Sequence, residues 1–322
     1  MAEYKGIKGF TLQFLSADPT ANRGDTWYNS TTKIAKYSAV TTAGAWASGG
    51  ALNVARQRTA GTGAQTAGLA FGGQVNLTTT EEYNGSSWAV GGNLPSGRQA
   101  MAGAGTQTAG LIFSSWTPFL TTCDKYNGTS WTNTGSVNTA RGYLGGAGTQ
   151  TAALAYGGDT AVPASITAAT EEFDGSSWTN QNNMATARSA LASAGTQTAA
   201  LGSGGYEPSL SNKTEEYNGT SWTGGGALNT SRSNCGGFGI QTSAIATGGR
   251  QPGYSAATEE YNGSSWSNTT NRSVLKDRFA ALGTSASGLT AGGESPGSGN
   301  GVTTTEEWTG AGVTLTKTIE TD

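Results

Sequence analysis

One pattern of polar and aromatic positions returns along the chain at nearly even spacing. Its clearest copy, Thr-Glu-Glu-Tyr-Asn-Gly-Ser-Ser-Trp, occupies residues 80–88, and close copies occupy 170–178, 214–222 and 258–266. A degenerate copy covers 125–131, and a truncated one covers 305–308. The aromatic residue after the acidic pair recurs at intervals of 43 to 47 residues, which is the period of four-stranded propeller blades.

The pattern within each period predicts two β-hairpins. The acidic strand ends in Asn-Gly, as at Asn84-Gly85, before a short segment that ends in Trp. Asn-Gly supplies the positive φ angles of a tight hairpin turn. Upstream, a block of alanines and glycines contains a central Gly-Thr-Gln and ends at a glycine pair such as Gly204-Gly205, which predicts an inner hairpin. Small side chains suit strands that crowd around a central axis, so the predicted fold is an all-β propeller.

Two ways of counting the repeat give different blade numbers. Seven aromatic positions in register, from Tyr37 to Trp308, favour seven blades, with residues 25–49 as a degenerate first blade closed by Trp46. Six inner hairpins, each led by an arginine, favour six blades, with the N-terminal segment as an added layer. Seven blades are the prediction, and six are the alternative.

The two ends of the chain lie outside the repeat. Residues 8–16 alternate apolar and polar positions, which predicts a strand. This strand either adds to the propeller or docks on a neighbouring subunit or scaffold. Residues 313–319 also alternate, and we expect them to close the ring against the N-terminal blade, because closure removes free strand edges. The predicted organisation is an attachment or closure segment over 1–24 and a propeller over 25–322.

Composition narrows the candidate chemistry. The 322 residues include no histidine, the commonest general base and a frequent metal ligand, and we expect neither a metal nor a cofactor. Charged residues make up 12% of the chain, the net charge is −3 and no basic cluster occurs, so nucleic acid is not an expected partner. Because the sequence has no long apolar run and no signal-type leader, we expect no membrane insertion and no export by the ordinary secretory route. The two cysteines make no disulfide framework.

The repeated charges suggest a structural network. Adjacent glutamates on a strand point to opposite faces, and the pair returns in nearly every copy, whereas an active site occurs once. We expect one glutamate of each pair to meet a repeated arginine, within or between blades, through charge-assisted hydrogen bonds. We therefore expect no catalytic residue and no enzymatic activity. The candidate charges are Arg56, Arg98, Arg141, Arg188, Arg232 and Arg278, with Glu82, Glu172, Glu216, Glu260 and Glu307.

The spacing of these arginines adds one detail. Each of the first five stands 16 residues before its glycine pair, or before Ser114-Ser115 in the second copy, whereas Arg278 stands 14 residues before Gly292. This difference predicts an inner hairpin two residues shorter in the last copy, as terminal repeats are often atypical.

Loop aromatics are the candidate contacts with a ligand or partner. Most Trp and Tyr residues are expected to pack between blades, but Trp116, Phe119, Tyr206 and Tyr254 fall in loops, where exposed aromatic side chains can anchor a partner. The loops after the glycine pairs vary most in length, which marks either a binding face or tolerated drift in exposed loops. The repeated glutamines Gln107, Gln150 and Gln197 either line one mouth of the channel or lie in plain solvated turns.

The chain resembles the kelch repeat in its glycine pair, acidic strand, Tyr and Trp, and in the Ala-Arg that opens most inner hairpins. The resemblance covers residues 25–308. The interval from Tyr83 to Trp88 is shorter than in most kelch repeats, so loop functions of that family do not carry over directly. Galactose-oxidase-like enzymes share the propeller, but their copper site needs histidines, which this chain lacks.

A more specific resemblance is to kelch-like repeat proteins encoded by marine bacteriophages. It rests on Asn-Thr-Ala-Arg over 138–141, on the recurring Gly-Thr-Gln-Thr-Ala and on the opening segment over residues 4–10. The resemblance implies a virion protein made in the host cytoplasm: a tail-fibre component, an appendage or a capsid decoration. Its partners would be other virion proteins, attached through residues 1–24 or through one face of the ring. The alternative is an adhesin that binds a host-surface glycan or receptor through propeller loops.

Overall fold

The computed structural model describes residues 13–19, 25–40, 43–161, 164–299, 301–312 and 314–319. The chain divides into two compact units: a propeller unit, Trp46–Trp308, and a terminal unit that combines Met1–Ala45 with Thr309–Asp322. Every regular element in the described segments is a strand. Over the same segments, no helix is long and apolar enough to cross a membrane.

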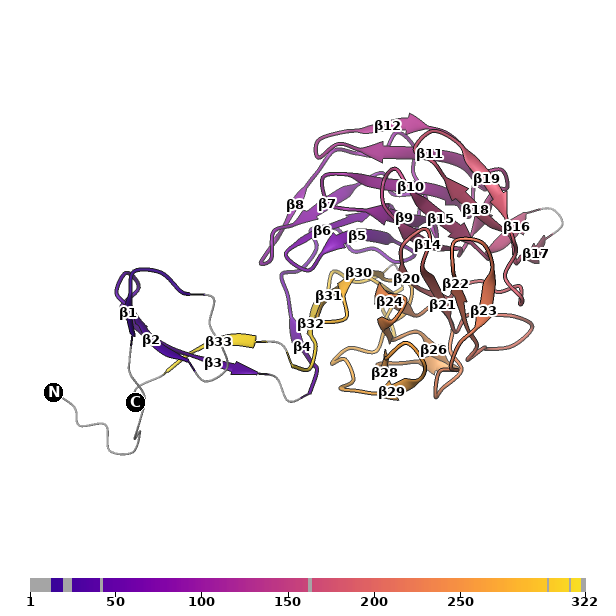
Figure 1. Cartoon of the computed structure of the whole chain (residues 1–322). Helices are drawn as coiled ribbons and strands as arrows, with labels where there is room; N and C mark the ends of the chain where they lie inside the picture. The colour runs from indigo at the N-terminus through magenta and orange to yellow at the C-terminus, as the bar shows by residue number, and fades with distance from the viewer. Residues whose placement is uncertain are drawn as a thin grey trace. The chain divides into compact units, whose positions relative to one another are not determined.

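Six four-stranded sheets form the blades of the propeller unit (Figure 1). Blade 1 contains β5 (Ala60–Ala64), β6 (Ala67–Phe71), β7 (Thr80–Tyr83) and β8 (Trp88–Val90). Blade 2 contains β9 (Ala102–Gly105), β10 (Gly110–Ser115), β11 (Leu120–Tyr126) and β12 (Trp131–Thr134). Blade 3 contains β14 (Gly145–Gly148), β15 (Ala153–Tyr156), β18 (Thr170–Phe173) and β19 (Trp178–Gln181).

The other three blades repeat this order. Blade 4 contains β20 (Ala192–Gly195), β21 (Ala200–Ser203), β22 (Thr214–Tyr217) and β23 (Trp222–Gly224). Blade 5 contains β24 (Gly236–Ile240), β25 (Ser243–Thr247), β28 (Thr258–Tyr261) and β29 (Trp266–Asn268). Blade 6 contains β30 (Ala280–Thr284), β31 (Ser287–Ala291), β32 (Thr305–Thr309) and β4 (Ala45–Ser48). The predicted all-β propeller of four-stranded blades is confirmed.

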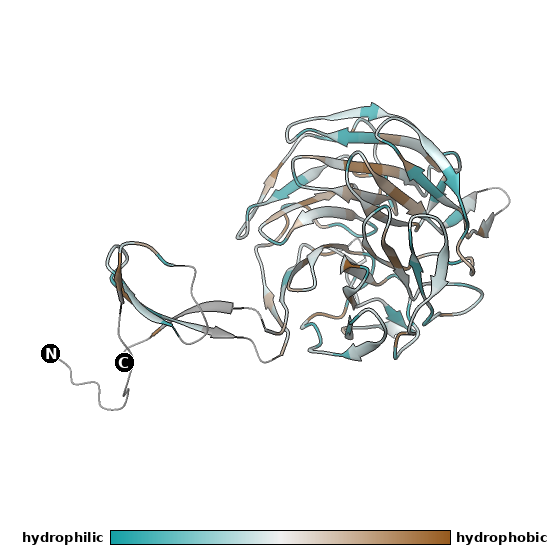
Figure 2. Cartoon of the chain, viewed as in Figure 1, coloured by the Kyte–Doolittle hydropathy of each residue, from teal (hydrophilic) through white to brown (hydrophobic). Residues whose placement is uncertain are grey.

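Small side chains line the propeller axis, as the sequence predicts. The innermost strands alternate buried and half-buried positions, and the second strand of each blade is almost fully buried. A Cβ atom on Gly103 of β9 would lie 2.6 Å from Cζ of Phe71 in blade 1, so nothing larger than glycine fits there without displacing the ring. Figure 2 shows the hydrophobic colour on middle strands such as β10 and the hydrophilic colour on outer strands such as β12.

The ring closes within blade 6, which takes its outer strand from the N-terminal side of the repeat. Strand β4 pairs next to β32, and the Trp46 ring lies 5.2 Å from the Trp308 ring. Trp46 therefore has the role of a blade-closing tryptophan, but in the last blade and not in a degenerate first one. The described part of the propeller unit holds six blades, so the preferred count of seven is corrected to the alternative of six.

Neighbouring blades are joined by tryptophan–threonine hydrogen bonds. Trp131 Nε1 donates to Thr80 Oγ1 of the preceding blade at 2.9 Å, and equivalent bonds start from Trp46, Trp88, Trp222 and Trp266. Trp178 lacks this bond and its Nε1 is buried without a partner, because Cys123 stands where the other blades have threonine. Each indole thus combines apolar packing with a satisfied donor in five interfaces out of six.

The terminal unit is built from both ends of the chain. Its sheet has the order β1 (Gln13–Leu15), β2 (Thr26–Asn29), β3 (Ile34–Val40), β33 (Thr314–Thr318). The C-terminal strand thus pairs with β3 and does not close the propeller. The expected domain boundary after residue 24 is corrected as well, because residues 25–45 belong to the terminal unit. Of the strand expected over 8–16, residues 8–12 lie outside the described segments, and β1 pairs in parallel with β2.

Candidate functional site

A buried ion pair anchors each blade, and it lies within the blade. Arg56 Nη2 lies 2.5 Å from Glu81 Oε1, and Arg188 Nη2 lies 3.1 Å from Glu215 Oε1, with all four side chains buried. The same pair recurs as Arg98–Asp124, Arg141–Glu171 and Arg232–Glu259. The predicted arginines therefore do bind the acidic strand, but through its first carboxylate and not through the second glutamates named from the sequence.

These anchors also fix the loops at one face of the propeller. Nη1 of Arg188 donates to the carbonyl oxygens of Gly204 and Lys213, both at 2.7 Å, which are the two ends of the loop between β21 and β22. Glu215 in turn accepts the backbone N–H of Ala185 at 2.6 Å. We call the six loops between second and third strands the mouth loops. In blade 4, the buried Arg188–Glu215 pair thus holds both ends of the mouth loop.

Blade 6 builds its anchor from different residues. Lys276 occupies the position of Arg56, 16 residues before Gly292, and its Nζ donates to Thr304 O at 3.1 Å. Arg272 binds Glu306 through Nε at 2.9 Å and Nη2 at 2.7 Å. Burial lowers the pKa of Arg272 to about 10. Arg278 is therefore not an anchor, and the shorter hairpin predicted from its position is corrected: β30 and β31 have the same lengths as β5 and β6.

The second glutamates join neighbouring blades. Tyr126 Oη donates to Glu82 Oε1 of the preceding blade at 2.5 Å, and Tyr217, Tyr261 and Tyr83 bind Glu172, Glu216 and Glu307 in the same way. Burial and this bond raise the pKa of Tyr126 to about 12. Glu260 has no such tyrosine, because Trp308 stands in that place. In the remaining interface, Lys125 replaces the glutamate and lies 5.4 Å from the Phe173 ring, a cation–π contact.

The repeated glutamines also join blades, which corrects the expectation that they line a channel mouth or lie in solvated turns. Gln150 Nε2 donates to Gly110 O at 3.0 Å and to Tyr126 O at 2.6 Å, both in the preceding blade. Gln65, Gln107, Gln197 and Gln241 make the same two bonds.

A closed ring of backbone hydrogen bonds surrounds the axis beside the mouth loops. Each of six residues donates its N–H to the carbonyl oxygen of the equivalent residue in the preceding blade, at 2.7 to 3.1 Å. All six have φ between 51° and 54°, which is uncommon for residues other than glycine. We call this ring the collar; its members are Arg58, Ala100, Tyr143, Ala190, Asn234 and Arg278.

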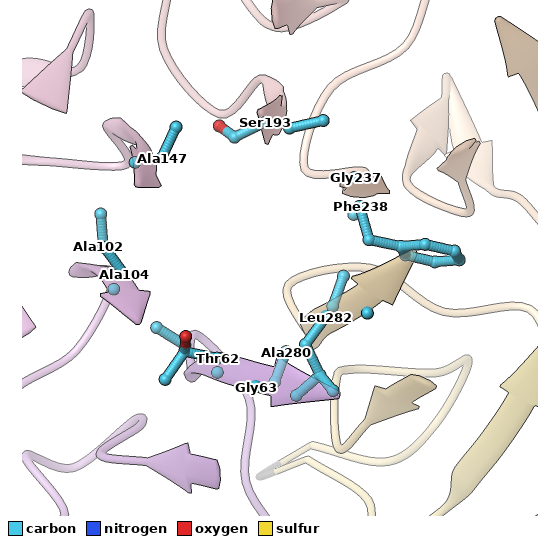
Figure 3. A pocket seen from close by; sticks show the side chains of 18 of the residues that line it. Thr62, Gly63, Ala102, Ala104, Ala147, Ser193, Gly237, Phe238, Ala280 and Leu282 are labelled. Carbon is cyan, nitrogen blue, oxygen red and sulfur yellow. The ribbon is translucent and has the colours of Figure 1, made fainter. Parts of the chain in front are cut away.

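The collar surrounds a cavity of about 100 Å³. Below it, a layer that includes Met101, Leu144 and Leu191 lines both this cavity and a central one of about 250 Å³. Figure 3 shows the central cavity, with Ala102, Ala147 and other small residues around an open centre. Its walls carry alanine, glycine and a few hydroxyl groups, so polar and charged chemistry is concentrated at the collar.

The structure brings two of the four predicted contact aromatics together at the collar. The Trp116 ring lies 6.2 Å from the Phe119 ring and 5.5 Å from the Tyr143 ring. The other two lie in separate mouth loops. Tyr254 stacks on Arg250 at 4.4 Å and donates to Glu294 at 2.8 Å, while Tyr206 is 44% exposed.

Sequence reasoning missed the collar and Arg58, and it assigned Arg278 to an anchor. The signal was present, because every collar residue follows the anchor position by two residues, from Arg58 after Arg56 to Arg278 after Lys276. These positions differ from copy to copy, so a search for what the copies share passes over them. Two small sheets lie at the mouth loops. One has three strands, β13 (Arg141–Gly142), β16 (Asp159–Ala161) and β17 (Ala164–Ile166), and the other has two, β26 (Arg250–Gln251) and β27 (Gly253–Tyr254).

Neither cysteine is positioned as a reactive thiol. Both are free and buried, and burial raises the pKa of Cys123 to about 12. Among the described residues, no group of three or more Cys, Asp or Glu side chains is placed to hold a metal ion.

Comparison with known proteins gives the fold and nothing finer. No family model matches the sequence, and no curated protein is detectably similar to it. The solved structure of YjhT is similar, with a TM-score of 0.67 and 14% sequence identity, over 79% of this chain and 95% of the YjhT chain. At this identity, the similarity supports the β-propeller and carries no information on activity.

Proposed function

We propose that this chain is a non-enzymatic structural protein of a bacteriophage virion, which displays a rigid propeller from an attached terminal unit. The observation that carries the proposal is the terminal unit itself. Both ends of the chain meet there in one sheet, separate from the propeller. Such a unit, built from segments on both sides of the repeat, suits attachment of the chain to a particle. The similarity of the sequence to kelch-like phage proteins supports the same role.

The charge network supports a structural role over catalysis. Buried carboxylates in an active site usually keep an unsatisfied or perturbed group for the reaction. Here the first carboxylate of each acidic strand is bound to a cation, and four of the second glutamates accept a tyrosine hydroxyl. The repeat thus uses its charges to fix blades and loops.

Cryo-electron microscopy of the native particle tests this proposal. The expected result is propeller density on the capsid or along an appendage at a fixed stoichiometry, with the terminal unit against another virion protein. Particles that contain no copy of the chain, as judged also by mass spectrometry of purified virions, would refute it. If the propeller face contacts the particle and the terminal unit contacts nothing, the proposal has assigned attachment to the wrong unit.

A second candidate, an adhesin for a host-surface glycan or receptor, is favoured by the aromatic cluster at the collar. Trp116 contacts both Phe119 and Tyr143, and Tyr143 lines the collar cavity. Aromatic side chains often dominate binding at an interface. A glycan array or a host-cell binding assay with Trp116→Ala tests it. Val90→Ala is the matched control, because Val90 is 68% exposed on an outer strand. Binding that survives Trp116→Ala unchanged would argue against this candidate.

A further inference from the structure

Arg58 differs from every other arginine that the structure describes. Nine arginines lie in the described segments, and eight of them have a carboxylate within 4.0 Å. Arg58 has none. A half-buried cation without a counter-charge is unfavourable unless something else compensates it, so this position invites an external anion.

The neighbours of Arg58 hold its guanidinium in place without neutralising it. Nη1 donates to Gln99 Oε1 at 3.1 Å, and Cζ lies 5.4 Å from the centre of the Trp116 ring. Gln99 is itself held by Asn76 and by Thr117 O, at 3.4 and 3.2 Å. The Nε atom is buried with no hydrogen-bond partner. The side chain is therefore positioned in advance by polar and aromatic contacts, and donors remain to be satisfied.

The nearby acids are already engaged with other groups. Next to Arg58 on the collar, Arg278 binds Glu294 at 2.6 Å, and Arg250 binds Asp277 at 2.5 Å. Asp159 is close enough to Tyr143 to act on its pKa, and burial raises the pKa of Asp159 itself. None of these three carboxylates lies within 4.0 Å of Arg58. The collar carries alanine at positions 100 and 190, and its residues line a cavity of about 100 Å³.

Tyr143 supplies a second free polar group. Its backbone N–H belongs to the collar, but its hydroxyl has no partner among the residues that the structure describes. Arg58 and Arg278 are both close enough to Tyr143 to act on its pKa electrostatically, although burial dominates and raises that pKa. Arg58 and Tyr143 both line the cavity of about 100 Å³, and a guanidinium with a phenol supplies donors suited to a planar anion.

We propose that the collar binds a small ligand that carries one carboxylate group, with the carboxylate on Arg58 and the rest of the ligand in the cavity of about 100 Å³. The size of the cavity limits the occupant to a small acid or to the carboxylated end of a sugar. This site is independent of the proposed virion role, because it requires only the folded propeller. It would narrow the adhesin alternative to anionic ligands.

Calorimetric titration of the full chain tests the proposal with glucuronate and acetate as probes and methyl glucoside as the neutral comparison. The expected dissociation constant for at least one carboxylate is on the order of 1 mM, and Arg58→Gln weakens binding about tenfold or more. Binding of glucuronate alone identifies an acidic sugar as the source of the carboxylate, and binding of both probes identifies a simple organic acid. Lys213→Gln is the matched control, since it removes one positive charge from a mouth loop, away from the collar.

Two stability measurements separate a binding role from a structural one. Because Arg58 has no ion pair to lose, Arg58→Gln is expected to melt no lower than the wild type, whereas Arg188→Ala melts lower. Ala100→Glu places a carboxylate on the neighbouring collar position, where it can form an ion pair with Arg58 and take the place of an external anion. This variant is expected to gain thermal stability and to lose binding of either probe.

Three results would overturn the inference. The first is a wild type that binds neither carboxylate, and the second is an Arg58→Gln variant that binds as tightly as the wild type. The third is a melting temperature for Arg58→Gln as low as that of Arg188→Ala, which would make Arg58 a structural residue. A failed glycan array with intact carboxylate binding would remove the adhesin alternative and leave this site standing.

Discussion

Exchanging Arg272 for leucine and Lys276 for arginine would convert the anchor of blade 6 into that of blade 5, where Leu228 and Arg232 hold the same places. The other four blades also carry a buried apolar residue at the first position, namely Leu52, Leu94, Val137 and Met184. Blade 6 thus differs from the repeat by two coupled changes that together keep one guanidinium on Glu306. The expected behaviour is that either change alone is harmful and that both together are tolerated.

The structure sets the size of the single effect. Arg272→Leu removes both hydrogen bonds to Glu306 Oε2, leaving Lys276 Nζ at 3.8 Å. Breaking a buried ion pair costs about 3–5 kcal/mol. Leucine recovers part of this cost, because Arg272 Nη1 is buried without a partner. We therefore expect a loss of about 3 kcal/mol, which for a unit of this size lowers the melting temperature by roughly 6–12 °C.

The double variant should recover most of that loss. In Arg272→Leu with Lys276→Arg, the new guanidinium reaches Glu306 as Arg232 reaches Glu259 in blade 5. The expected free energy of unfolding is within about 1 kcal/mol of the wild type, so the coupling between the two positions is more than about 2 kcal/mol. Thermal and urea unfolding of the wild type, both single variants and the double variant measure this cycle. Additive losses would refute the proposed equivalence of the two anchors.

The reverse exchange in blade 5 isolates the aromatic contribution to the unusual anchor. Arg272 Cζ lies 4.3 Å from the Phe279 ring, and blade 5 has Cys235 in the corresponding position. Leu228→Arg with Arg232→Lys therefore builds the same ion pair without the cation–π contact. We expect it to be less stable than the forward exchange, by about 0.5–2 kcal/mol. Equal stabilities would show that Phe279 does not matter.

Three further outcomes are expected. Cys123→Thr should give Trp178 its missing acceptor and raise stability by about 1 kcal/mol, measured as a higher melting temperature. Gln150→Ala should lower stability by about 1–3 kcal/mol, because two carbonyl groups lose their donor; an unchanged urea midpoint would contradict this. The pKa values of Tyr83, Tyr126 and Tyr261 are raised to about 12 in the folded state. The stability that these hydroxyl groups contribute is therefore fully present below pH 10 and is lost between about pH 10 and about pH 12. Phenylalanine variants of the three tyrosines should show a smaller loss over this range.

The repeated features of the sequence carry most of the fold. A hairpin forms at Asn84-Gly85 as expected, with Tyr83 opposite Trp88. Only Gly85 has a positive φ, of 91°, so the expected pair of positive φ angles is corrected; the Asn84 side chain instead accepts the backbone N–H groups of Ser86 and Ser87. The hairpin itself was predictable, because its turn depends on local backbone chemistry. The same applies to the inner hairpins, whose small residues are required at the axis. The sequence predicted that each arginine binds a glutamate of the acidic strand, but it did not predict which of the two glutamates. Which of two adjacent glutamates faces inward depends on the blade twist and the register of the sheet, which the sequence pattern leaves open.

Ring closure could not be read from the repeat for a different physical reason. Tyr37 and Trp46 keep the period, which suggested one blade over residues 25–49. In the structure, Tyr37 pairs with Lys317 in the terminal unit, while Trp46 belongs to blade 6. Periodicity constrains spacing along the chain, whereas the choice of partner strand depends on which free edge is available in space. The alternating pattern of residues 313–319 predicted a strand in the same way, but it did not show that the strand pairs with β3 instead of closing the ring.

The departures from the repeat separate structural variation from candidate function. At the Lys125–Phe173 interface a cation faces a plain aromatic ring where four other interfaces pair glutamate with tyrosine, and in blade 6 Arg272 compensates for Lys276. Both departures come in pairs, as expected when stability constrains two contacting positions. Arg58 places a charge at a collar position where two other blades have alanine, and no acidic residue nearby compensates it. An uncompensated charge on a rigid backbone ring is unexplained by folding, and this asymmetry is the physical reason to look for a ligand there first.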